Sequence, residues 1–303
     1  MERVKILWFE APDNNTTAEY GESLGKRLGI HIDSVNIFDI KFEIKNNESI
    51  LTVNNENIVQ KYDVLIIRSC LPYLSEAITI AKLFHEAGKT VIDESMANEA
   101  FVISKMHDYI RLSNNDINIP NTLQLHNLSQ ITEFIDTYSA PYIVKSIHGD
   151  SSFHVYKVYN YVEVEAIFLK YRQSKLIIQE FIDSKELYKV SVIGYKAIKT
   201  ISIHHSLDEE NLLIDSSKKY ISTSVSEDYD FIRHFAEKCA KTLSIEFCKV
   251  DIKVKNGKPY VLEANRRPGI LGFKNETGYE VGIDLINYAV AKARRKYEKN
   301  RNG

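Results

Sequence analysis

Residues 250–269 read VDIKVKNGKPYVLEANRRPG and carry the clearest structural signal in the chain. Asn256 and Gly257 form the dipeptide that a tight β-hairpin needs, because both central residues of a type I′ turn take positive φ. We therefore expect Val250–Lys255 and Pro259–Asn265 to pair as antiparallel strands.

Three side chains of the metal-binding type lie on this hairpin, namely Asp251, Glu263 and Asn265. Side chains alternate between the two faces of a strand, so Glu263 and Asn265 share one face, and strand pairing lets Asp251 join them. Two carboxylates and an amide oxygen suit a hard ion such as Mg²⁺, which is normally shared with substrate phosphates. The simpler alternative is an exposed hairpin with solvated acids.

Composition indicates a soluble globular protein. With 303 residues, 44% of them hydrophobic, the chain can form two or three modest domains or one elaborate domain. The formal net charge of -2 gives no overall electrostatic case for nucleic acid or membrane partners.

The cysteines and the N-terminus favour a cytoplasmic protein. Cys70, Cys239 and Cys248 are widely spaced and include no CxxC pair, so neither a disulfide framework nor a zinc site is indicated. The apolar run near the N-terminus is too short for a signal peptide, and no run reaches the roughly 18 residues of a membrane span.

The pattern of apolar runs predicts α/β and α+β architecture in three parts. Residues 1–100 read as a small α/β layer with a mainly parallel sheet, interrupted by a polar hairpin excursion over residues 36–58. A helix from Ala100 to Leu112 is expected to link this layer to a compact α+β unit that ends at residue 183. Residues 184–303 form the third part.

Four segments occur in the right order for nucleotide binding. Lys105 lies on the linking helix, and Lys145 ends a strand and precedes a polar turn whose Gly149 lets backbone N–H groups approach a phosphate. Taken singly, either lysine could be an ordinary surface residue. The next apolar strand ends in four residues whose backbone could read an adenine edge: Gln179, Glu180, Phe181 and Ile182. Glu186, just beyond, could hold a ribose hydroxyl.

These residues resemble the ATP-grasp superfamily in consistent order over residues 100–275. The resemblance implies a two-subdomain ATP-grasp fold over 101–183 and 184–303 that clamps ATP. In the family pattern, Lys105 and Lys145 resemble the two nucleotide lysines, and residues 148–153 the mobile loop. His148 on this loop is assigned to the nucleotide or substrate. The remaining matches are the hinge over 179–182 and the magnesium ligands Asp251, Glu263 and Asn265.

Within the superfamily, the run from Glu263 to Gly269 resembles the E-x-N-x-x-P-G signature of the RimK-type glutamate ligases. Two features depart from that group. Leu187–Val190 stands where RimK-type enzymes usually carry Asp-Ile-Arg, and the intervening loop is shorter. This stretch is more similar to the ATP-grasp inositol phosphate kinases, and residues 148–154 also resemble a loop of those kinases. The paired arginines after Asn265 are absent from those kinases.

Strand alternation suggests an anionic second substrate. Lys253 shares a face with Asp251, Arg267 continues the period of Glu263, and Lys189 should lie nearby. Three cations near the metal would bind a carboxylate or phosphate. The alternative is that they only offset the ATP phosphates and the acids.

The favoured function is an ATP-dependent carboxylate–amine ligase that forms an amide or peptide bond through an acylphosphate. Its expected partners are small-molecule or peptide substrates, and its cofactors are ATP with one or two Mg²⁺ ions, or Mn²⁺ instead. Two other functions stay open, which are an ATP-grasp kinase acting on an inositol phosphate or similar polyol and a non-catalytic nucleotide-binding protein. The oligomeric state stays open as well.

Overall fold

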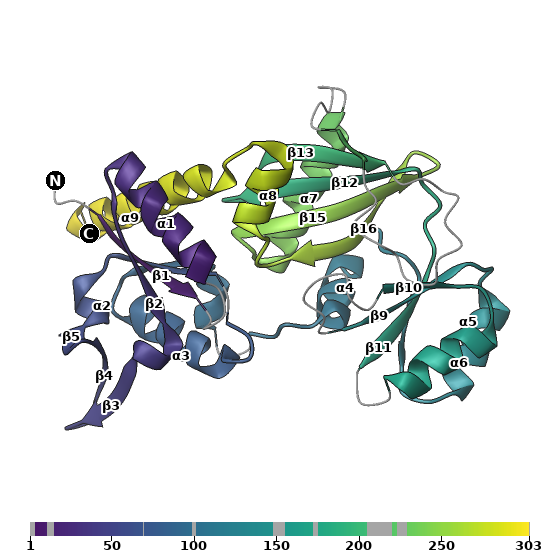
Figure 1. Ribbon diagram of the computed structural model, residues 1–303, viewed down its shortest axis with the longest axis horizontal. Coiled ribbons are helices and arrows are strands. Elements are labelled where there is room, and N and C mark those ends of the chain that lie inside the picture. The colour runs from purple at the N-terminus through teal and green to yellow at the C-terminus, as the bar shows by residue number, and fades with distance from the viewer. Residues whose placement is uncertain are drawn as a thin grey trace.

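The computed structural model describes residues 4–10, 15–68, 70–98, 101–147, 155–171, 175–204, 220–222 and 229–302. It has mixed α/β and α+β architecture, built on one parallel and three antiparallel sheets (Figure 1). The predicted fold class is therefore confirmed. None of the helices in these ranges is both long enough and apolar enough to cross a membrane.

The first layer is a four-stranded parallel sheet that is buried on both faces. Its strands, in spatial order, are β2 (His31–Asn36), β1 (Lys5–Glu10), β6 (Val64–Ile67) and β7 (Thr90–Ile92). Along β1, Ile6 and Trp8 enter one hydrophobic core and Leu7 and Phe9 enter the other. Helix α1 (Asn15–Leu28) contributes to the first core and α3 (Leu74–Glu86) to the second, which explains why residues 6–9 of β1 form an uninterrupted apolar run.

The predicted excursion forms a separate small sheet that projects from this layer. Its strands are β3 (Lys41–Lys45), β4 (Glu48–Val53) and β5 (Glu56–Asn57), flanked by the short helices η1 (Ile37–Asp39) and α2 (Ile58–Lys61). Two Asn–Asn pairs, at 46–47 and 54–55, take positive φ and make its turns.

The linking helix α4 spans Lys105–Ser113 and follows η2 (Glu94–Ala97). Sequence reasoning placed its start at Ala100, but the described residues 101–104 are not helical. Ser104 explains the later start, because its side chain caps the helix by accepting a hydrogen bond from the backbone N–H of His107 (3.5 Å).

The central unit is a four-stranded antiparallel sheet covered by two helices. The sheet order is β10 (Val155–Val158), β9 (Tyr142–Ser146), β11 (Leu176–Glu180) and β8 (Thr122–Leu125), and the helices are α5 (Ser129–Thr137) and α6 (Tyr161–Lys170). One hydrophobic core joins the sheet to both helices.

The third unit holds the predicted hairpin of residues 250–265. Its sheet order is β14 (Tyr220–Ser222), β13 (Lys196–His204), β12 (Glu186–Ile193), β15 (Phe247–Lys255) and β16 (Lys258–Asn265), with helix α7 (Asp230–Leu243) packed against it. Asn256 and Gly257 have φ of 53° and 73°, so the predicted turn and the antiparallel pairing are confirmed.

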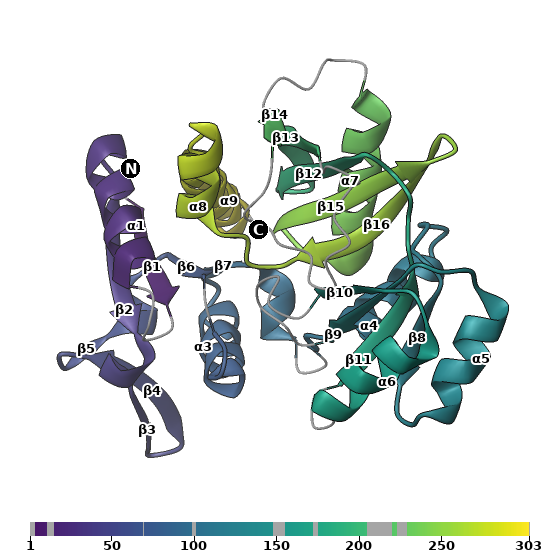
Figure 2. The ribbon, with the colours of Figure 1, turned by 45° about the vertical axis from the view of Figure 1, so that its right-hand side comes forward.

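After β16 the chain returns to the first layer through α8 (Ile270–Thr277) and α9 (Val281–Asn302), as Figures 1 and 2 show. Leu285, Ile286 and Ala289 of α9 share one hydrophobic core with Ile6 and Trp8 of β1. The third part of the chain thus packs on the first. The domain boundaries at residues 100 and 183 stay predictions.

A reciprocal pair of carboxylates joins the first layer to the start of β15. Asp93 Oδ1 accepts hydrogen bonds from the backbone N–H groups of Glu246 and Phe247, the latter at 2.9 Å. In return, Glu246 Oε2 accepts from the backbone N–H of Glu94 (3.0 Å) and from Lys292 Nζ (2.9 Å). The strand that carries Asp251 is therefore anchored to the N-terminal layer.

The substitution Asp93→Asn tests this junction. Burial and the nearby charge of Glu246 raise the pKa of Asp93 to about 7. The folded protein therefore retains a proton that the unfolded chain loses, and this group lowers the free energy of unfolding as pH rises from about 4 to about 7. The Asn variant keeps the oxygen acceptor and does not ionise. Between about pH 5 and about pH 7, the free energy of unfolding of Asp93→Asn should rise by about 2 kcal/mol relative to that of wild type, as measured by urea denaturation.

Asp39→Asn is the control, because it removes a carboxylate that is exposed in the same layer. If the free energies of unfolding of wild type and Asp93→Asn change in parallel across this pH range, Asp93 does not retain a proton in the folded protein.

Candidate active site

One extra residue in β16 brings two of the predicted metal ligands onto the same face. β15 and β16 pair in one register from the turn to Ile252 and Val261, and the register then shifts so that Asp251 lies opposite Glu263. Leu262 is the additional residue and makes a β-bulge. Without the shift, Asp251 would lie opposite Leu262, and Glu263 would point to the other face.

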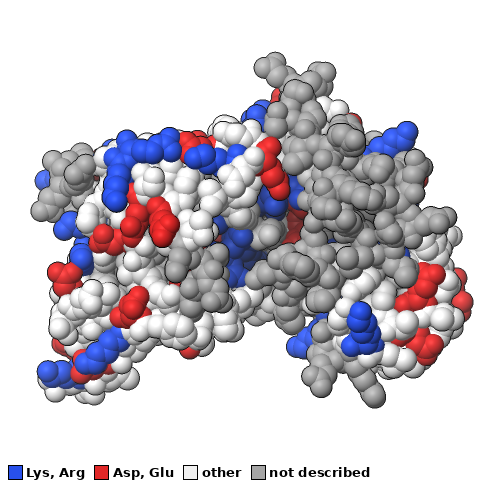
Figure 3. All heavy atoms as spheres, viewed as in Figure 1, with Lys and Arg blue, Asp and Glu red and all other residues white. Residues whose placement is uncertain are grey.

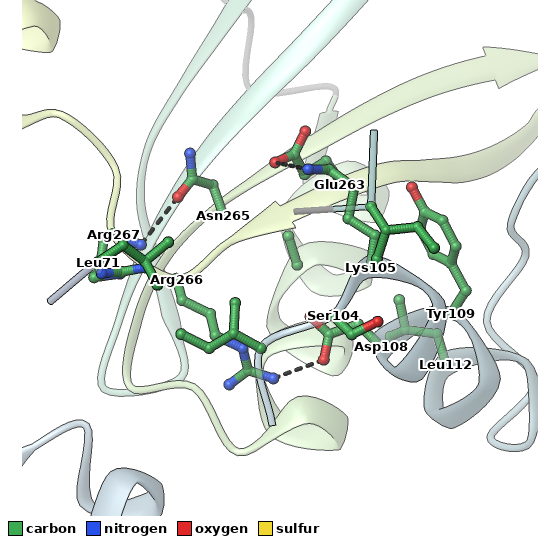
Figure 4. Close-up of a pocket in the computed structure, with 13 residues that line it drawn as sticks. Leu71, Ser104, Lys105, Asp108, Tyr109, Leu112, Glu263, Asn265, Arg266 and Arg267 are labelled. Carbon is green, nitrogen blue, oxygen red and sulfur yellow. Dashed lines mark hydrogen bonds and ion pairs between the residues drawn. The ribbon is translucent and has the colours of Figure 1, made fainter. Parts of the chain in front are cut away.

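Two lysines approach the two carboxylates. Lys189 lies directly opposite Asp251 on β12, with Nζ 3.8 Å from Asp251 Oδ2. Lys105 Nζ, at the start of α4, is 3.6 Å from Glu263 Oε1 (Figure 4). Both separations exceed hydrogen-bonding distance, so these contacts are Coulombic. Charges alternate in the order Lys189, Asp251, Glu263, Lys105.

The oxygen atoms of this site fit a hard cation. Asp251 Oδ1 is buried and has no hydrogen-bond partner in the described part of the chain, although buried polar atoms are normally paired. Asn265 Oδ1 accepts the backbone N–H of Arg267 (3.0 Å) and keeps a second lone pair. Among the described residues, no group of three or more His, Cys, Asp or Glu side chains forms a metal site, so an ion here would rely on two acids and an amide.

Lys145 lies beside this set on β9, with 8% of its surface exposed. Its Nζ donates a hydrogen bond to the backbone carbonyl of Leu262 (3.1 Å). Burial lowers the pKa of Lys145 to about 8, and the negative charges of Glu263 and Asp251 act in the opposite direction. The structure thus brings Lys105, Lys145 and the acids together.

The first half of the predicted hinge is tied to β8 and to the hairpin. Gln179 is buried, and its Nε2 donates to Thr122 Oγ1 (2.7 Å). The Glu180 carboxylate accepts from Asn121 Nδ2 (2.7 Å) and from Lys255 Nζ (3.0 Å). These side-chain bonds fix the backbone at the end of β11.

The second half of the hinge meets Lys253. The Nζ atom of Lys253 donates to the carbonyl of Ile182 (3.2 Å) and lies 4.9 Å from the ring centroid of Phe181, as does Lys157 Nζ. Burial lowers the pKa of Lys253 to about 8. Sequence reasoning grouped Lys253 with the metal ligands, but its ammonium group contacts the hinge because the side chain extends across to the central unit.

Of the three remaining predicted residues, the structure describes one. Glu186 is the first residue of β12 and accepts a hydrogen bond from Tyr188 Oη. His148 and Gly149, on the predicted mobile loop, lie outside the described residues.

The two arginines after β16 point to different partners. Arg266 Nη2 is 2.7 Å from Asp108 Oδ1, and both side chains are largely buried. Arg267 Nη1 is 2.9 Å from Cys70 Sγ, at the first layer. Both arginines line a pocket with Lys105 and Glu263 (Figure 4). On the face shown in Figure 3, positive and negative side chains meet in the hollow at the centre.

Sequence reasoning did not single out two residues of α4 that line this pocket. Asp108 and Tyr109 follow Lys105 at helical spacing of three and four residues, which places them on its face of the helix. This spacing from Lys105 is the sequence pattern that could have predicted Asp108 and Tyr109 as site residues. Tyr109 resembled an ordinary core residue, and its 2% exposure is consistent with such a position.

Comparison with known proteins identifies the family. The profile of the RimK-like ATP-grasp domain matches residues 104–289, which is more than half of the chain. The probable alpha-L-glutamate ligase 2 of Pseudoalteromonas atlantica is 26% identical over 311 residues, covering 98% of this chain and 99% of that protein. A probable alpha-L-glutamate ligase of Vibrio parahaemolyticus is 24% identical, with coverage of 91% and 92%.

Solved structures agree on the fold. The ATP-grasp ligase PsnB, complexed with minimal precursor, Mg and ADP, has a TM-score of 0.71 and 17% identity, covering 97% of this chain and 99% of that chain. D-alanine–D-alanine ligase from Bacillus anthracis, complexed with ATP, has a TM-score of 0.67 and 16% identity, with coverage of 98% and 99%. The predictions of an ATP-grasp fold and of an ADP-forming, RimK-like ligase are confirmed. The chain belongs to the RimK-like ATP-grasp family.

Proposed function

We propose that this protein uses ATP and Mg²⁺ to join a carboxylate to an amine through an acylphosphate. The observation that carries the proposal is the alternating row of Lys189, Asp251, Glu263 and Lys105 beside the buried Lys145. A kinase would use the same charges, and the family favours the ligase.

Asp251, Glu263 and Asn265 would hold the metal, since they offer two carboxylates and an amide oxygen and since Asp251 Oδ1 is buried without a partner among the described residues. When bound, one or two Mg²⁺ ions, or Mn²⁺ in their place, would neutralise charge on the ATP phosphates.

The lysines bind the phosphate groups of ATP. Lys105, Lys145 and Lys189 offer compact positive charges, which suit phosphate oxygens. The hinge backbone from Gln179 to Ile182 reads the adenine edge, and Glu186 holds a ribose hydroxyl. His148 and Gly149 contribute to binding the nucleotide or the substrate.

The reaction proceeds by two displacements that these groups position. A substrate carboxylate oxygen attacks the γ-phosphorus and the bond to ADP breaks, which leaves an acylphosphate. The amine nitrogen then attacks the carbonyl carbon, the C–O bond to phosphate breaks, and orthophosphate leaves while the amine loses a proton to solvent. The protein contributes positioning and charge stabilisation, and no side chain becomes covalently modified.

Arg267 binds an anionic group of the acceptor. Its guanidinium lines the pocket next to Glu263 and Asn265 and faces the first layer at Cys70. A guanidinium pairs well with a carboxylate, so an amino acid or peptide fits this position. Because the matched relatives are named as probable alpha-L-glutamate ligases, glutamate is the first amine to test.

A substrate screen tests the reaction class. With ATP, Mg²⁺ and pools of carboxylates, hydroxylamine should intercept an acylphosphate and yield a hydroxamate, with ADP and free orthophosphate formed in equal amounts. Amino acids should replace hydroxylamine and yield an amide detectable by mass spectrometry. A phosphorylated polyol without free orthophosphate would instead identify a kinase, and ATP binding without turnover in all pools would indicate a non-catalytic protein.

Replacing Glu263 by Gln should lower turnover by at least about 100-fold, because the variant loses a charged ligand for the metal while keeping the side-chain shape. The measurement is ADP formation over a range of Mg²⁺ concentrations. Glu43→Gln, on the projecting small sheet, is the matched control. Near-normal turnover of Glu263→Gln at low Mg²⁺ would remove Glu263 from the metal site.

Replacing Arg267 by Gln should raise KM for the anionic acceptor by about 10-fold and change KM for ATP less than about 2-fold, because only the acceptor loses a charge-assisted hydrogen bond. Steady-state kinetics with each substrate varied in turn measures both constants. Arg27→Gln, which breaks a surface contact to Glu280, is the control. An equal rise in both constants would assign Arg267 to the nucleotide instead.

A further inference from the structure

Three parts of the chain meet at the backbone carbonyl of Leu262. This oxygen accepts one hydrogen bond from Tyr109 Oη (2.6 Å) and another from Lys145 Nζ (3.1 Å). Tyr109 belongs to α4, Lys145 to β9 and Leu262 to β16. The bulge makes the meeting possible, because the extra residue falls outside the regular cross-strand pairing.

Tyr109 contacts the lysine in a second way. The centroid of its ring is 5.5 Å from Lys145 Nζ, within the range of a cation–π interaction. Burial raises the pKa of Tyr109 well above its ordinary value, so the hydroxyl stays protonated and donates its hydrogen bond throughout the neutral range.

Among the described residues, the two direct partners of the Lys145 ammonium group are uncharged. A buried ammonium group is costly unless something compensates for the lost water, and here a carbonyl dipole and an aromatic face do so. An acid in direct contact would neutralise the lysine. A carbonyl and a ring leave its full positive charge to act on phosphate oxygens.

We propose that Tyr109 is a positioning residue that holds the charged Lys145 toward the nucleotide phosphates by fixing the orientation of the Leu262 peptide. The inference rests on the proposed role of Lys145 in binding ATP. Without the hydroxyl, the bulge peptide can rotate and Lys145 loses an aligned acceptor.

The variant Tyr109→Phe removes the hydroxyl and keeps the ring. Calorimetric titration with ATP and Mg²⁺ at about pH 7.5 should show binding weakened by about 3- to 10-fold, as expected for the loss of one hydrogen bond between uncharged groups. The assay needs no acceptor. Tyr62→Phe is the matched control, because Tyr62 is equally buried and its hydroxyl donates to Asp33 (2.6 Å) in the first layer.

The pH dependence separates positioning from general loosening. Lys145 has a pKa of about 8, so wild-type affinity for ATP should fall as pH rises past that value. In Tyr109→Phe the ammonium form is less stabilised, and the fall should begin at lower pH. The substitution leaves unchanged the two acids that act on Lys145, Glu263 on β16 and Asp251 on β15. It also leaves unchanged the lysines that approach those acids, Lys105 on α4 and Lys189 on β12.

A double-mutant cycle with Lys145→Met gives the decisive result. If Tyr109 acts through Lys145, then Lys145→Met weakens ATP binding and adding Tyr109→Phe weakens it less than about 2-fold further. An equal effect of Tyr109→Phe in both backgrounds, or an unshifted pH profile, would overturn the inference and leave the role of Lys145 intact. Unchanged ATP binding in Lys145→Met would reject that role and the inference together.

Discussion

The bulge at Leu262 is the constraint on which the site depends. In an unbroken hairpin, Asp251 and Glu263 would point to opposite faces, and two acids could not share one ion. The interruption of the ladder is compensated locally, because the backbone N–H of Val261 donates to the carbonyl of Asn118 (2.9 Å), in the segment after α4. The same extra residue thus aligns the acids and docks the linking segment onto β16.

The cations of the site differ in what neutralises them, and this difference sorts their proposed tasks. Arg266 forms a short ion pair with Asp108 and fastens α4 to the end of β16. Lys105 and Lys189 lie at 3.6 and 3.8 Å from the acids, close enough to limit repulsion between two carboxylates and too far for strong hydrogen bonds. Lys145 has a carbonyl and a ring as its partners. The lysine whose direct partners carry no negative charge, Lys145, is therefore the one we propose to contact phosphate most directly.

The features that could be predicted from the sequence are those that depend on short stretches of residues. Asn256 and Gly257 dictate the turn and hence the pairing of β15 with β16, and the order of Lys105, Lys145 and the hairpin acids indicated the family. The bulge was not predictable, because Leu262 looks like any apolar strand residue. Ser104 was a readable helix cap that the apolar residues before it obscured. The contact of Lys253 with Ile182 joins two units, and strand alternation fixes only the face on which a long side chain starts.

The return of α9 to the first layer has a consequence for synthesis. Ile6 and Trp8 are translated long before Leu285, Ile286 and Ala289, which lie on the last of the described helices and complete the core that holds Ile6 and Trp8. One face of the N-terminal sheet must therefore wait, with apolar surface exposed, until nearly all of the described chain has been translated. Excising the segment matched by the family profile, residues 104–289, would cut α9 within its length and remove the sheet against which this helix packs.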